Sequence, residues 1–448
     1  MNLPELKAKI ARKEIDTVMV AFPDVFGRLL GKRLTAHHFL DGVARKGTHA
    51  CDYLLTVNME MEPLPGFEFA NWEKGYGDFE LRPDLATLRV LPWHTATASV
   101  ICDLFQPKGR RVEEAPRSVL RRQLERLDHA GLTCMTASEP EFFLFNQDYH
   151  SAYTGRYAAL EPASDYRIDY HLAQPGRDET LMRALRNNLE AAGVPVESSK
   201  GEWGKGQHEV NFVYDQPLPM ADGHALFKQA TKEIAGQQGK CVTFMAKPDA
   251  AEVGSSCHIH MSLWQKRKNI FWDGKGRRGS KQFRQFLGGL LKYSPELCYF
   301  FAPTINSYKR YQPASWAPTK MAWAFDNRTV GFRVVGEADA FRVENRMPGA
   351  DANPYLAFAA MIAAGLAGME EGLDCGEVYA GNAYADPKLP ALPRSLREAA
   401  GMLDASKMAR RAFTDGVTQF YAHTARCEAQ AFDDAVTDWE KFRYFERI

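Results

Sequence analysis

Four short segments of the chain carry polar residues at every second position, with apolar residues between them. The segments are 138–145 (SEPEFFLF), 205–215 (KGQHEVNFVYD), 256–264 (SCHIHMSLW) and 341–348 (FRVENRMP). Successive side chains of a β-strand point to opposite faces of its sheet, so each polar set shares one face. The pattern therefore predicts a sheet that carries one polar face across several strands.

The residue types on these faces distinguish a binding site from an ordinary solvated sheet. A solvated face typically carries Lys, Thr and Ser, whereas these faces carry acids, histidines and arginines. They present Glu139 and Glu141; Gln207, Glu209 and Asn211; His258, His260 and Ser262; and Arg342, Glu344 and Arg346. Carboxylates beside imidazole suit Mg²⁺ or Mn²⁺, and the arginine fork suits phosphoryl oxygens. Each segment alone is compatible with a solvated sheet, but together they favour a site for metal ions and phosphate.

Two further groups of charged residues lie outside these segments. In the run 201–209 (GEWGKGQHE), Glu202 precedes Glu209 across a glycine-rich bend. This bend either returns Glu202 as a ligand beside Glu209 or forms a surface loop with one glutamate. Basic residues follow among prolines, aromatics and glycines, which favours an ordered loop before a strand over scattered surface charge. They are Lys309, Arg310, Arg328 and Arg333.

The overall composition excludes several classes of protein. The chain has 448 residues and is formally neutral, with 56 basic and 56 acidic residues, which argues against a nucleic-acid-binding protein. Its eight cysteines form no CxxC pair, so we expect neither a zinc ribbon nor a thioredoxin-type site. No segment reaches the roughly 18 apolar residues of a membrane span, and the start has no apolar signal-peptide core. We expect a reduced, cytoplasmic protein.

Short strands and turns predominate in the first hundred residues, whereas helices and strands alternate afterwards. A strand and turn are predicted at 16–27, strands at 85–94 and 98–105, and a polar linker at 106–116. Helices are predicted at 116–131, 179–193, 222–239 and 352–370, the last apolar enough to lie in the core. The sequence thus predicts an α+β protein with a small N-terminal domain, residues 1–108, and a large second domain, residues 109–448.

Six motifs of the chain resemble those of the glutamine synthetase family, in its type I-like branch. They are EPEFF (139–143), a glutamate pair ending in GQHE (202–209), GSSCHIHMS (254–262), NSYKR (306–310), NRT (327–329) and R-x-E-x-R followed by ANPYL (342–356). Each motif alone is weak, but their order and intervals are specific, and the resemblance covers essentially the whole chain. In character the chain is most similar to the γ-glutamylamide and γ-glutamylpolyamine synthetases.

The resemblance implies a fold and an assembly. The family has an N-terminal β-grasp domain and a catalytic domain of the glutamine synthetase/guanido kinase-like type, whose antiparallel strands form a funnel-shaped half-barrel. It usually assembles as a dodecamer of two hexameric rings, with active sites between neighbouring subunits of a ring. The expected partners are further copies of the chain, glutamate, and an amine or ammonia; neither nucleic acid nor a membrane is expected.

The resemblance also implies roles for individual residues. One divalent metal is expected on Glu141, Glu202 and Glu209, and a second on Glu139, His258 and Glu344. Nucleotide contacts are expected from Glu197, His260, Ser262 and Arg333, and glutamate contacts from Gly254 and Arg310. Arg328 and Arg346 are expected beside the transferred phosphoryl group and the substrate carboxylate, where with Glu344 they form the catalytic group.

These roles describe an ATP-dependent carbon–nitrogen ligase. Transfer of the ATP γ-phosphoryl group to the glutamate side chain makes γ-glutamyl phosphate, which a nitrogen nucleophile then attacks. The chemistry needs divalent metal across the phosphates, arginines on the transferred group and exclusion of water. We therefore expect ATP and Mg²⁺ or Mn²⁺ as cofactors.

Departures from the family pattern bear on the nitrogen substrate. In ammonia-using members a flap-loop glutamate follows the NSYKR arginine by six residues, and here that position is Trp316. A tryptophan removes a charge that ammonium needs and supplies an apolar wall for an alkyl or aryl amine, although a purely structural aromatic is the alternative. The N-terminal loop lacks the usual DGSS-type pattern, which leaves Asp52 and Asp78 as candidates for the nucleophile pocket. The C-terminal segment 435–448 resembles members that use amines.

Three functions stay open on this basis. A γ-glutamylamide synthetase acting on an organic amine is favoured; a glutamine synthetase using ammonia and a catalytically silent homologue are the alternatives, the last disfavoured by the intact carboxylates. The sequence does not name the amine, so methylamine, ethanolamine, polyamines, isopropylamine and anilines are all candidates. Tyr384 lies near the place of the family's adenylylated tyrosine, but no acidic run follows it, and we expect no adenylylation.

Overall fold

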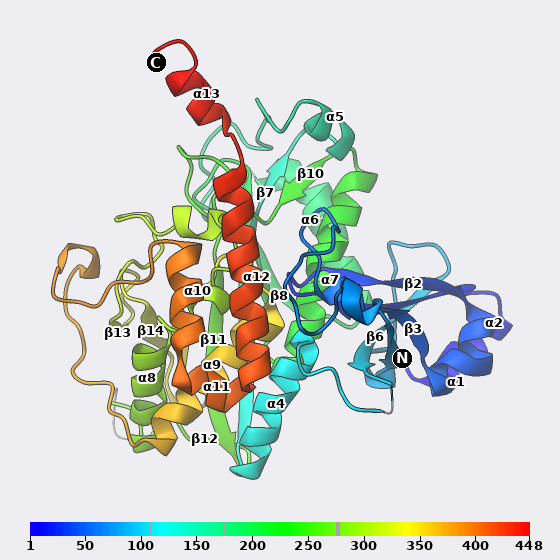
Figure 1. The fold of residues 1–448 in the computed structure, drawn as a ribbon, viewed down its shortest axis with the longest axis horizontal. Coiled ribbons are helices and arrows are strands. Elements are labelled where there is room, and N and C mark those ends of the chain that lie inside the picture. Colours follow the sequence, from blue (N-terminus) through cyan, green and yellow to red (C-terminus); the bar gives the residue numbers. More distant parts are fainter. Residues whose placement is uncertain (108, 174, 275–277) are drawn as a thin grey trace.

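Two β-sheets and a set of helices make up the computed structural model, which describes residues 1–107, 109–173, 175–274 and 278–448. Figure 1 shows the smaller, N-terminal sheet at one side of the molecule and the larger sheet covered by helices from the second half of the chain. The predicted domain boundary at residue 108 lies outside the described residues, so the division at 108/109 stays a prediction.

The N-terminal sheet has the strand order β2-β1-β6-β4-β3, and the short strand β5 also pairs with β6. Its strands are β1 (Thr17–Pro23), β2 (Leu29–Thr35), β3 (Thr48–Cys51), β4 (Asp78–Pro83), β5 (Arg89–Val90) and β6 (Thr97–Phe105). The helices α1 (Leu3–Ala11), α2 (Ala36–His38) and α3 (Ala44–Lys46) accompany it. β1 and β6 pair in parallel, and the other pairs are antiparallel, as in the expected β-grasp arrangement.

The predicted strand at 85–94 is wrong over most of its length. A 3-10 turn occupies Leu85–Thr87, and only Arg89–Val90 pairs with β6. The side chain of Asp84 caps this turn by accepting from the backbone N–H of Ala86 at 3.2 Å. An aspartate that bonds the backbone two residues on favours a turn, and here this local preference prevails over the apolar pattern.

The larger sheet has the order β13-β14-β15-β11-β7-β9-β8, with β10 beside β7 and β12 beside β11. Its strands are β7 (Thr133–Phe145), β8 (Val196–Gly201), β9 (Gln207–Phe212), β10 (Cys241–Thr243), β11 (Cys257–Gln265), β12 (Lys268–Asn269), β13 (Trp323–Phe325), β14 (Phe332–Val335) and β15 (Arg342–Asn345). Only the β13–β14 pair is parallel among the described strands of this sheet. The four segments with alternating polar residues are thus confirmed as strands β7, β9, β11 and β15, and the sheet forms the expected half-barrel.

Strand register aligns the polar residues of these strands across the sheet. His258 of β11 lies opposite Glu139 of β7, and His260 lies opposite Glu344 of β15. On the other side of β7, Glu141 lies opposite Glu209 of β9. Side chains of directly opposed residues share a face and lie within reach of one another, so the register gathers acids and imidazoles from four strands.

The helices are α4 (Pro116–His129), α5 (Tyr149–Thr154), α6 (Glu179–Ala191), α7 (Pro217–Gln237), α8 (Lys281–Tyr293), α9 (Pro354–Glu370), α10 (Leu396–Ala405), α11 (Lys407–Phe413), α12 (Asp415–Asp434) and α13 (Asp438–Tyr444). Three predicted helices are confirmed as α4, α6 and α9, and α9 is buried from Pro354 to Gly368. The fourth begins earlier than predicted, because Pro217 starts the first turn of α7, where its missing N–H costs nothing. Within the described residues no helix is long and apolar enough to cross a membrane.

A buried cluster of ions joins the N-terminal sheet to the helices α4, α7 and α9. The guanidinium of Arg117, in α4, donates to Asp103 (2.6 Å) and Asp84 (2.7 Å) from the N-terminal sheet region and to Asp222 (2.9 Å) from α7. Tyr355 of α9 donates its hydroxyl to the same Asp222 at 2.6 Å. This buried arginine is hydrogen-bonded through all three of its nitrogens to three carboxylates, and it links segments far apart in the sequence.

Close packing of α8 on α9 depends on glycine. A Cβ on Gly289 of α8 would collide with the carbonyl oxygen of Ala364 in α9, a backbone atom that cannot move aside. We expect Gly289→Ala to destabilise the protein by about 1–3 kcal/mol, the usual cost of overpacking, measured as a lower midpoint of thermal unfolding. The matched control is Gly401→Ala in α10, where no atom lies within 4 Å of the added Cβ. That change should stabilise by about 0.5–1 kcal/mol, and equal midpoints for both variants would contradict the packing argument.

Candidate active site

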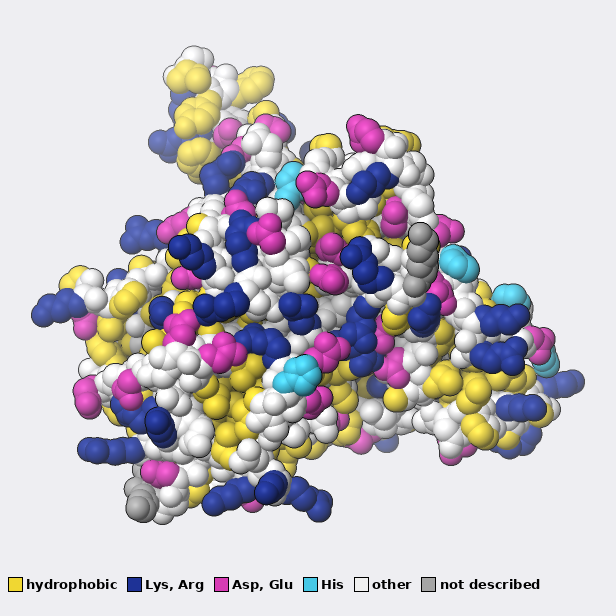
Figure 2. All heavy atoms as spheres, turned by 60° about the horizontal axis from the view of Figure 1, so that its bottom comes forward, with side chains coloured by type: hydrophobic (Ala, Val, Ile, Leu, Met, Phe, Trp, Pro, Cys, Tyr) yellow, Lys and Arg dark blue, Asp and Glu magenta, His cyan; other side chains and the backbone are white. Residues whose placement is uncertain are grey.

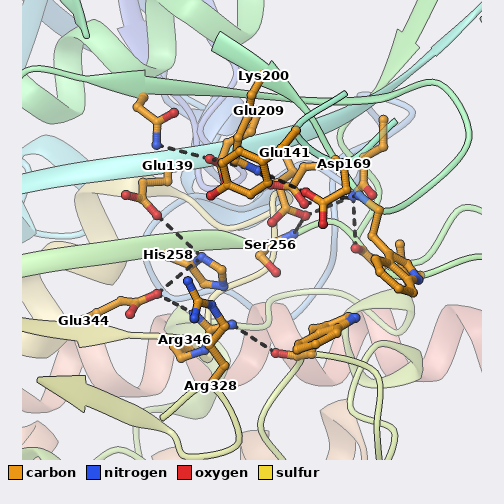
Figure 3. Close-up of a pocket in the computed structure, with 18 of the residues that line it drawn as sticks. Glu139, Glu141, Asp169, Lys200, Glu209, Ser256, His258, Arg328, Glu344 and Arg346 are labelled. Atoms are coloured by element: carbon orange, nitrogen blue, oxygen red, sulfur yellow. Dashed lines mark hydrogen bonds and ion pairs between the residues drawn. The ribbon is translucent and has the colours of Figure 1, made fainter. Parts of the chain in front are cut away.

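A cavity of about 530 Å³ opens on the polar face of the larger sheet. Figure 3 shows its acids and imidazole projecting from the strands toward the arginines on the opposite side. Most of the predicted site residues line it: Glu139, Glu141, Glu202, Glu209, Gly254, His258, Trp316, Arg328, Arg333, Glu344 and Arg346. The sheet register therefore brings residues more than two hundred positions apart in the sequence to one place.

Glu139, His258 and Glu344 form a group with ligand atoms suited to a metal ion. One atom of each lies within 4.8 Å of the others. Nδ1 of His258 is 3.6 Å from Glu139 and 3.5 Å from Glu344, and within the described part of the chain its buried Nε2 has no hydrogen-bond partner. Burial and the charge of Arg346 lower the pKa of His258, which favours the neutral form of the imidazole. A neutral imidazole between carboxylates is the form that binds a divalent cation, so these residues fit the predicted metal.

Glu141, Glu209 and His258 form a second group of this kind. Glu141 accepts from the side-chain amide of Gln207 (2.9 Å) and the backbone N–H of Ser256 (2.8 Å), which hold its carboxylate in place. Burial, and then the charges of Glu139 and Glu141, raise the pKa of Glu209 to about 8, while Lys200 opposes the shift. A divalent cation would remove this repulsion. Glu202, expected as a ligand of the same metal, lines the cavity, but its carboxylate contacts the Lys200 ammonium instead.

Two arginines beside Glu344 neutralise its carboxylate. Arg346 and Arg333 (3.0 Å) each bind one of its carboxylate oxygens. Burial alone would raise the pKa of Glu344, but the neighbouring cations, Arg346 foremost and Arg333 among the others, lower it to about 2. Arg328 lines the same side from an exposed position before β14. This concentration of guanidinium groups beside acids suits a phosphoryl group under transfer.

Four predicted residues do not line the cavity: Glu197, His260, Ser262 and Arg310. Glu197 is exposed on β8. His260 lies 2.9 Å from Glu139 through Nε2 and accepts from Arg342 at Nδ1, and Ser262 accepts from the indole of Trp264. His260 and Ser262 lie on the same face of β11 as His258, but further along the strand, beyond the cavity. Their nucleotide contacts stay a prediction, as does that of Glu197.

Arg310 lies behind the wall of the cavity. Its guanidinium donates to the carbonyls of Met347 (2.8 Å) and Arg346 (3.1 Å) and to the hydroxyl of Ser256 (2.6 Å). A Cβ on Gly254 would lie 2.6 Å from the Arg310 side chain, so this close approach requires glycine. Arg310 thus connects the end of β15 to the 254–256 loop, and its predicted glutamate contact is not tested by this arrangement.

Trp316 lies at the mouth of the cavity with an unusual backbone conformation. Its φ is 65°, a left-handed value that is uncommon for a large side chain. Its carbonyl accepts from Arg346 at 3.3 Å, and the next residue, Ala317, accepts from the Tyr384 hydroxyl at 2.9 Å. Its ring meets Trp203 edge to face, with centroids 5.8 Å apart. Two loops, 202–206 and 315–316, therefore form an aromatic wall.

The sequence patterns indicated no role for several lining residues, among them Asp169, Tyr170, Lys200 and Trp203. For Lys200 the signal was weak: Ser198, Lys200 and Glu202 are spaced two apart, but Ser199 and Gly201 between them are not apolar. Asp52 and Asp78, the candidates for the nucleophile pocket, lie at the β3–β4 edge of the N-terminal sheet and do not line this cavity. Which aspartate serves the nucleophile stays open.

Comparisons with known proteins agree with this geometry. The sequence profile of the glutamine synthetase catalytic domain matches residues 113–444. The γ-glutamylethanolamide synthetase GlnA4 of Streptomyces coelicolor is 48% identical, covering 100% of this chain and 96% of that protein. The glutamate–isopropylamine ligase of a Pseudomonas species is 37% identical, covering 98% and 97%. The solved structure of a GmaS/ADP complex superposes with a TM-score of 0.86 at 27% identity, covering 98% and 99%.

The chain belongs to the glutamine synthetase family, a family of carbon–nitrogen ligases. Within the family it is γ-glutamylamide synthetase-like, since both of these curated relatives are named for joining glutamate to an organic amine. The resemblance found in the six motifs is thereby confirmed, as is the expected fold.

Metal binding should depend on pH through Glu209. Below about pH 8 Glu209 keeps its proton in the metal-free protein, so a cation must displace that proton to bind. We expect the apparent affinity for Mn²⁺ to rise with pH, by up to about tenfold per unit below pH 8, and to level off above it. Isothermal titration calorimetry measures the affinity, and Glu209→Gln should bind more weakly and without the rise. Constant wild-type affinity between about pH 6.5 and 8.5 would show that Glu209 is ionised throughout.

Proposed function

We propose that this protein is an ATP-dependent γ-glutamylamide synthetase, which joins the γ-carboxylate of glutamate to an organic amine by way of γ-glutamyl phosphate. Family membership supports the ligase chemistry, and the names of the relatives support an amine as the acceptor. The observation that carries the proposal is Trp316, because it stands where ammonia-using members have an acidic flap residue.

The acidic side of the cavity suits activation of the glutamate carboxylate. Glu139, His258 and Glu344 would hold one Mg²⁺ or Mn²⁺, and Glu141 and Glu209, with Glu202, would hold the other. When bound, the metals supply positive charge to the phosphate oxygens of ATP. Arg328, Arg333 and Arg346 approach from the opposite side, where their charge would stabilise the phosphoryl group as it moves.

The aromatic side of the cavity suits the organic part of an amine. Trp316 and Trp203 present apolar rings, and Arg167 lies over the Trp203 ring at 4.6 Å from its centroid, which steadies that ring. Trp316 is 48% exposed, so its face is available to a small molecule in the cavity. An alkyl substituent that leaves water for these rings gains hydrophobic free energy, whereas ammonia gains none.

We also propose the dodecamer that is usual in the family. The C-terminal segment projects from the body of the molecule and carries hydrophobic side chains on its surface (Figures 1 and 2). Its exposed residues include Val436, Trp439, Phe442, Phe445 and Ile448. A projecting apolar segment is unfavourable in water and favours burial against another copy of the chain. Light scattering would give the number of subunits; a cytoplasmic location stays a prediction.

The reaction can be tested directly on the purified full-length protein. With glutamate, ATP and Mg²⁺, we expect phosphate release and a γ-glutamylamide product with at least one small organic amine, at a higher kcat/KM than with ammonium. Mass spectrometry of the product and a phosphate assay measure this. Turnover with ammonium alone would favour the glutamine synthetase alternative, and no turnover with any nitrogen substrate would favour the silent homologue.

Trp316 should decide between amines and ammonia. Trp316→Ala removes half of the aromatic wall, so we expect kcat/KM for an alkylamine to fall about 10–100-fold relative to that for ammonium, the range associated with small apolar contacts. The matched control is Trp316→Phe, which keeps an apolar ring and should retain most of the preference. An unchanged ratio in the alanine variant would mean that Trp316 is structural and does not contact the amine.

A further inference from the structure

Lys200 extends from β8 into the acidic side of the cavity. Its ammonium contacts the carboxylate of Glu202 and lies 3.7 Å from Glu209 and 3.9 Å from Asp169. The ring of Tyr170 covers it, with the ammonium 4.5 Å from the ring centroid. Figure 3 shows Lys200 beside Glu209 and close to Glu141, among the acids of the proposed metal site.

The backbone, and not a chance side-chain conformation, directs Lys200 to this place. In the β8–β9 pair Lys200 lies opposite Glu209, so both side chains emerge on the same face. Glu202 is two residues further along the chain and points the same way. The Lys200 side chain is only 20% exposed and that of Glu209 only 5%. A cation held on a strand this close to buried carboxylates has few alternative positions.

Charge balance explains why a cation is needed there. Glu141 and Glu209 lie opposite each other in the β7–β9 pair and both are buried, so their charges repel strongly when both are ionised. The Lys200 ammonium offsets part of this repulsion with one positive charge. A divalent cation on Glu202 and Glu209 would need the same carboxylate oxygens and would repel the ammonium at contact distance, so the two cannot occupy the place together.

We propose that Lys200 is an intramolecular counterion that takes the place of the divalent cation between Glu202 and Glu209, and that this cation must displace it to bind. The inference rests on the proposed metal site. It deepens that site by assigning a competing side chain to its Glu202 and Glu209 half. The other half has cations of its own, because Arg333 and Arg346 bind the carboxylate of Glu344. Binding to the half with Lys200 is weakened, because it breaks the ion pair between Lys200 and Glu202.

The proposal is tested by titrating Mn²⁺ into the full-length protein at one pH, with bound metal followed by electron paramagnetic resonance. Lys200→Met keeps the length of the side chain and removes its charge. We expect the Mn²⁺ at the Glu202 and Glu209 half to bind about tenfold or more tightly to this variant, because it no longer breaks an ion pair of roughly that strength. The metal-free variant should also unfold at a lower temperature, and Mn²⁺ should raise its midpoint more than that of the wild type.

The matched control is Lys205→Met, which removes an exposed lysine of the following turn and should bind Mn²⁺ as the wild type does. Equal or weaker Mn²⁺ affinity of the Glu202 and Glu209 half in Lys200→Met than in wild type would overturn the role of Lys200 while leaving the metal site intact. Absence of Mn²⁺ binding in both proteins would overturn the metal site itself, and this inference with it.

A measurement on the wild-type protein avoids dependence on the variant folding. If Mn²⁺ displaces Lys200, its amine should become more accessible, so its acetylation by a mild acylating reagent should increase severalfold when Mn²⁺ is added. Peptide mass spectrometry measures this at Lys200, with Lys205 as the internal reference. Unchanged or reduced acetylation of Lys200 at saturating Mn²⁺ would contradict displacement.

Discussion

The crowding of carboxylates on one face of the larger sheet is the constraint on which the rest of the site depends. Glu139 and Glu141 come from β7, Glu209 from the neighbouring β9, and Glu344 from β15, which β11 joins to β7; strand register holds the four together. Buried like charges at this density are unfavourable unless cations accompany them. The arginines on Glu344 and the ammonium of Lys200 beside Glu209 meet this requirement.

Charge and apolar surface are separated within the one cavity. Acids, imidazole and arginines occupy the sheet and the strand ends, whereas Trp203 and Trp316 meet on two loops at the mouth. The separation suits a ligase that must stabilise phosphate at one end and receive an organic amine at the other. Loops tolerate substitution more readily than paired strands, so a family can keep the phosphate chemistry and change the nitrogen substrate at residues such as Trp316.

Strands and site residues of this protein are predictable from the sequence when the pattern that indicates them is local. The strands of the polar face are predictable because period-two alternation is a local pattern, and the acids and histidines within that pattern are enough to mark the site. The predicted strand at 85–94 is wrong because Asp84 forms a local turn. Lys200 received no role because its segment is short and its partner Glu209 lies across a strand pair, and Trp203 because its partner Trp316 lies on a distant loop.

The sequence by itself determined the family, the chemistry and the set of acids and bases, because residue types and their spacing within a strand are enough to recognise each motif. Only the tertiary structure decided which of them meet. It placed Glu141 opposite Glu209, moved Arg310 behind the cavity wall and brought Lys200 onto Glu202 and Glu209. The physical reason is that contacts between strands and loops depend on register and packing, which are set by the whole core and are encoded in no single segment.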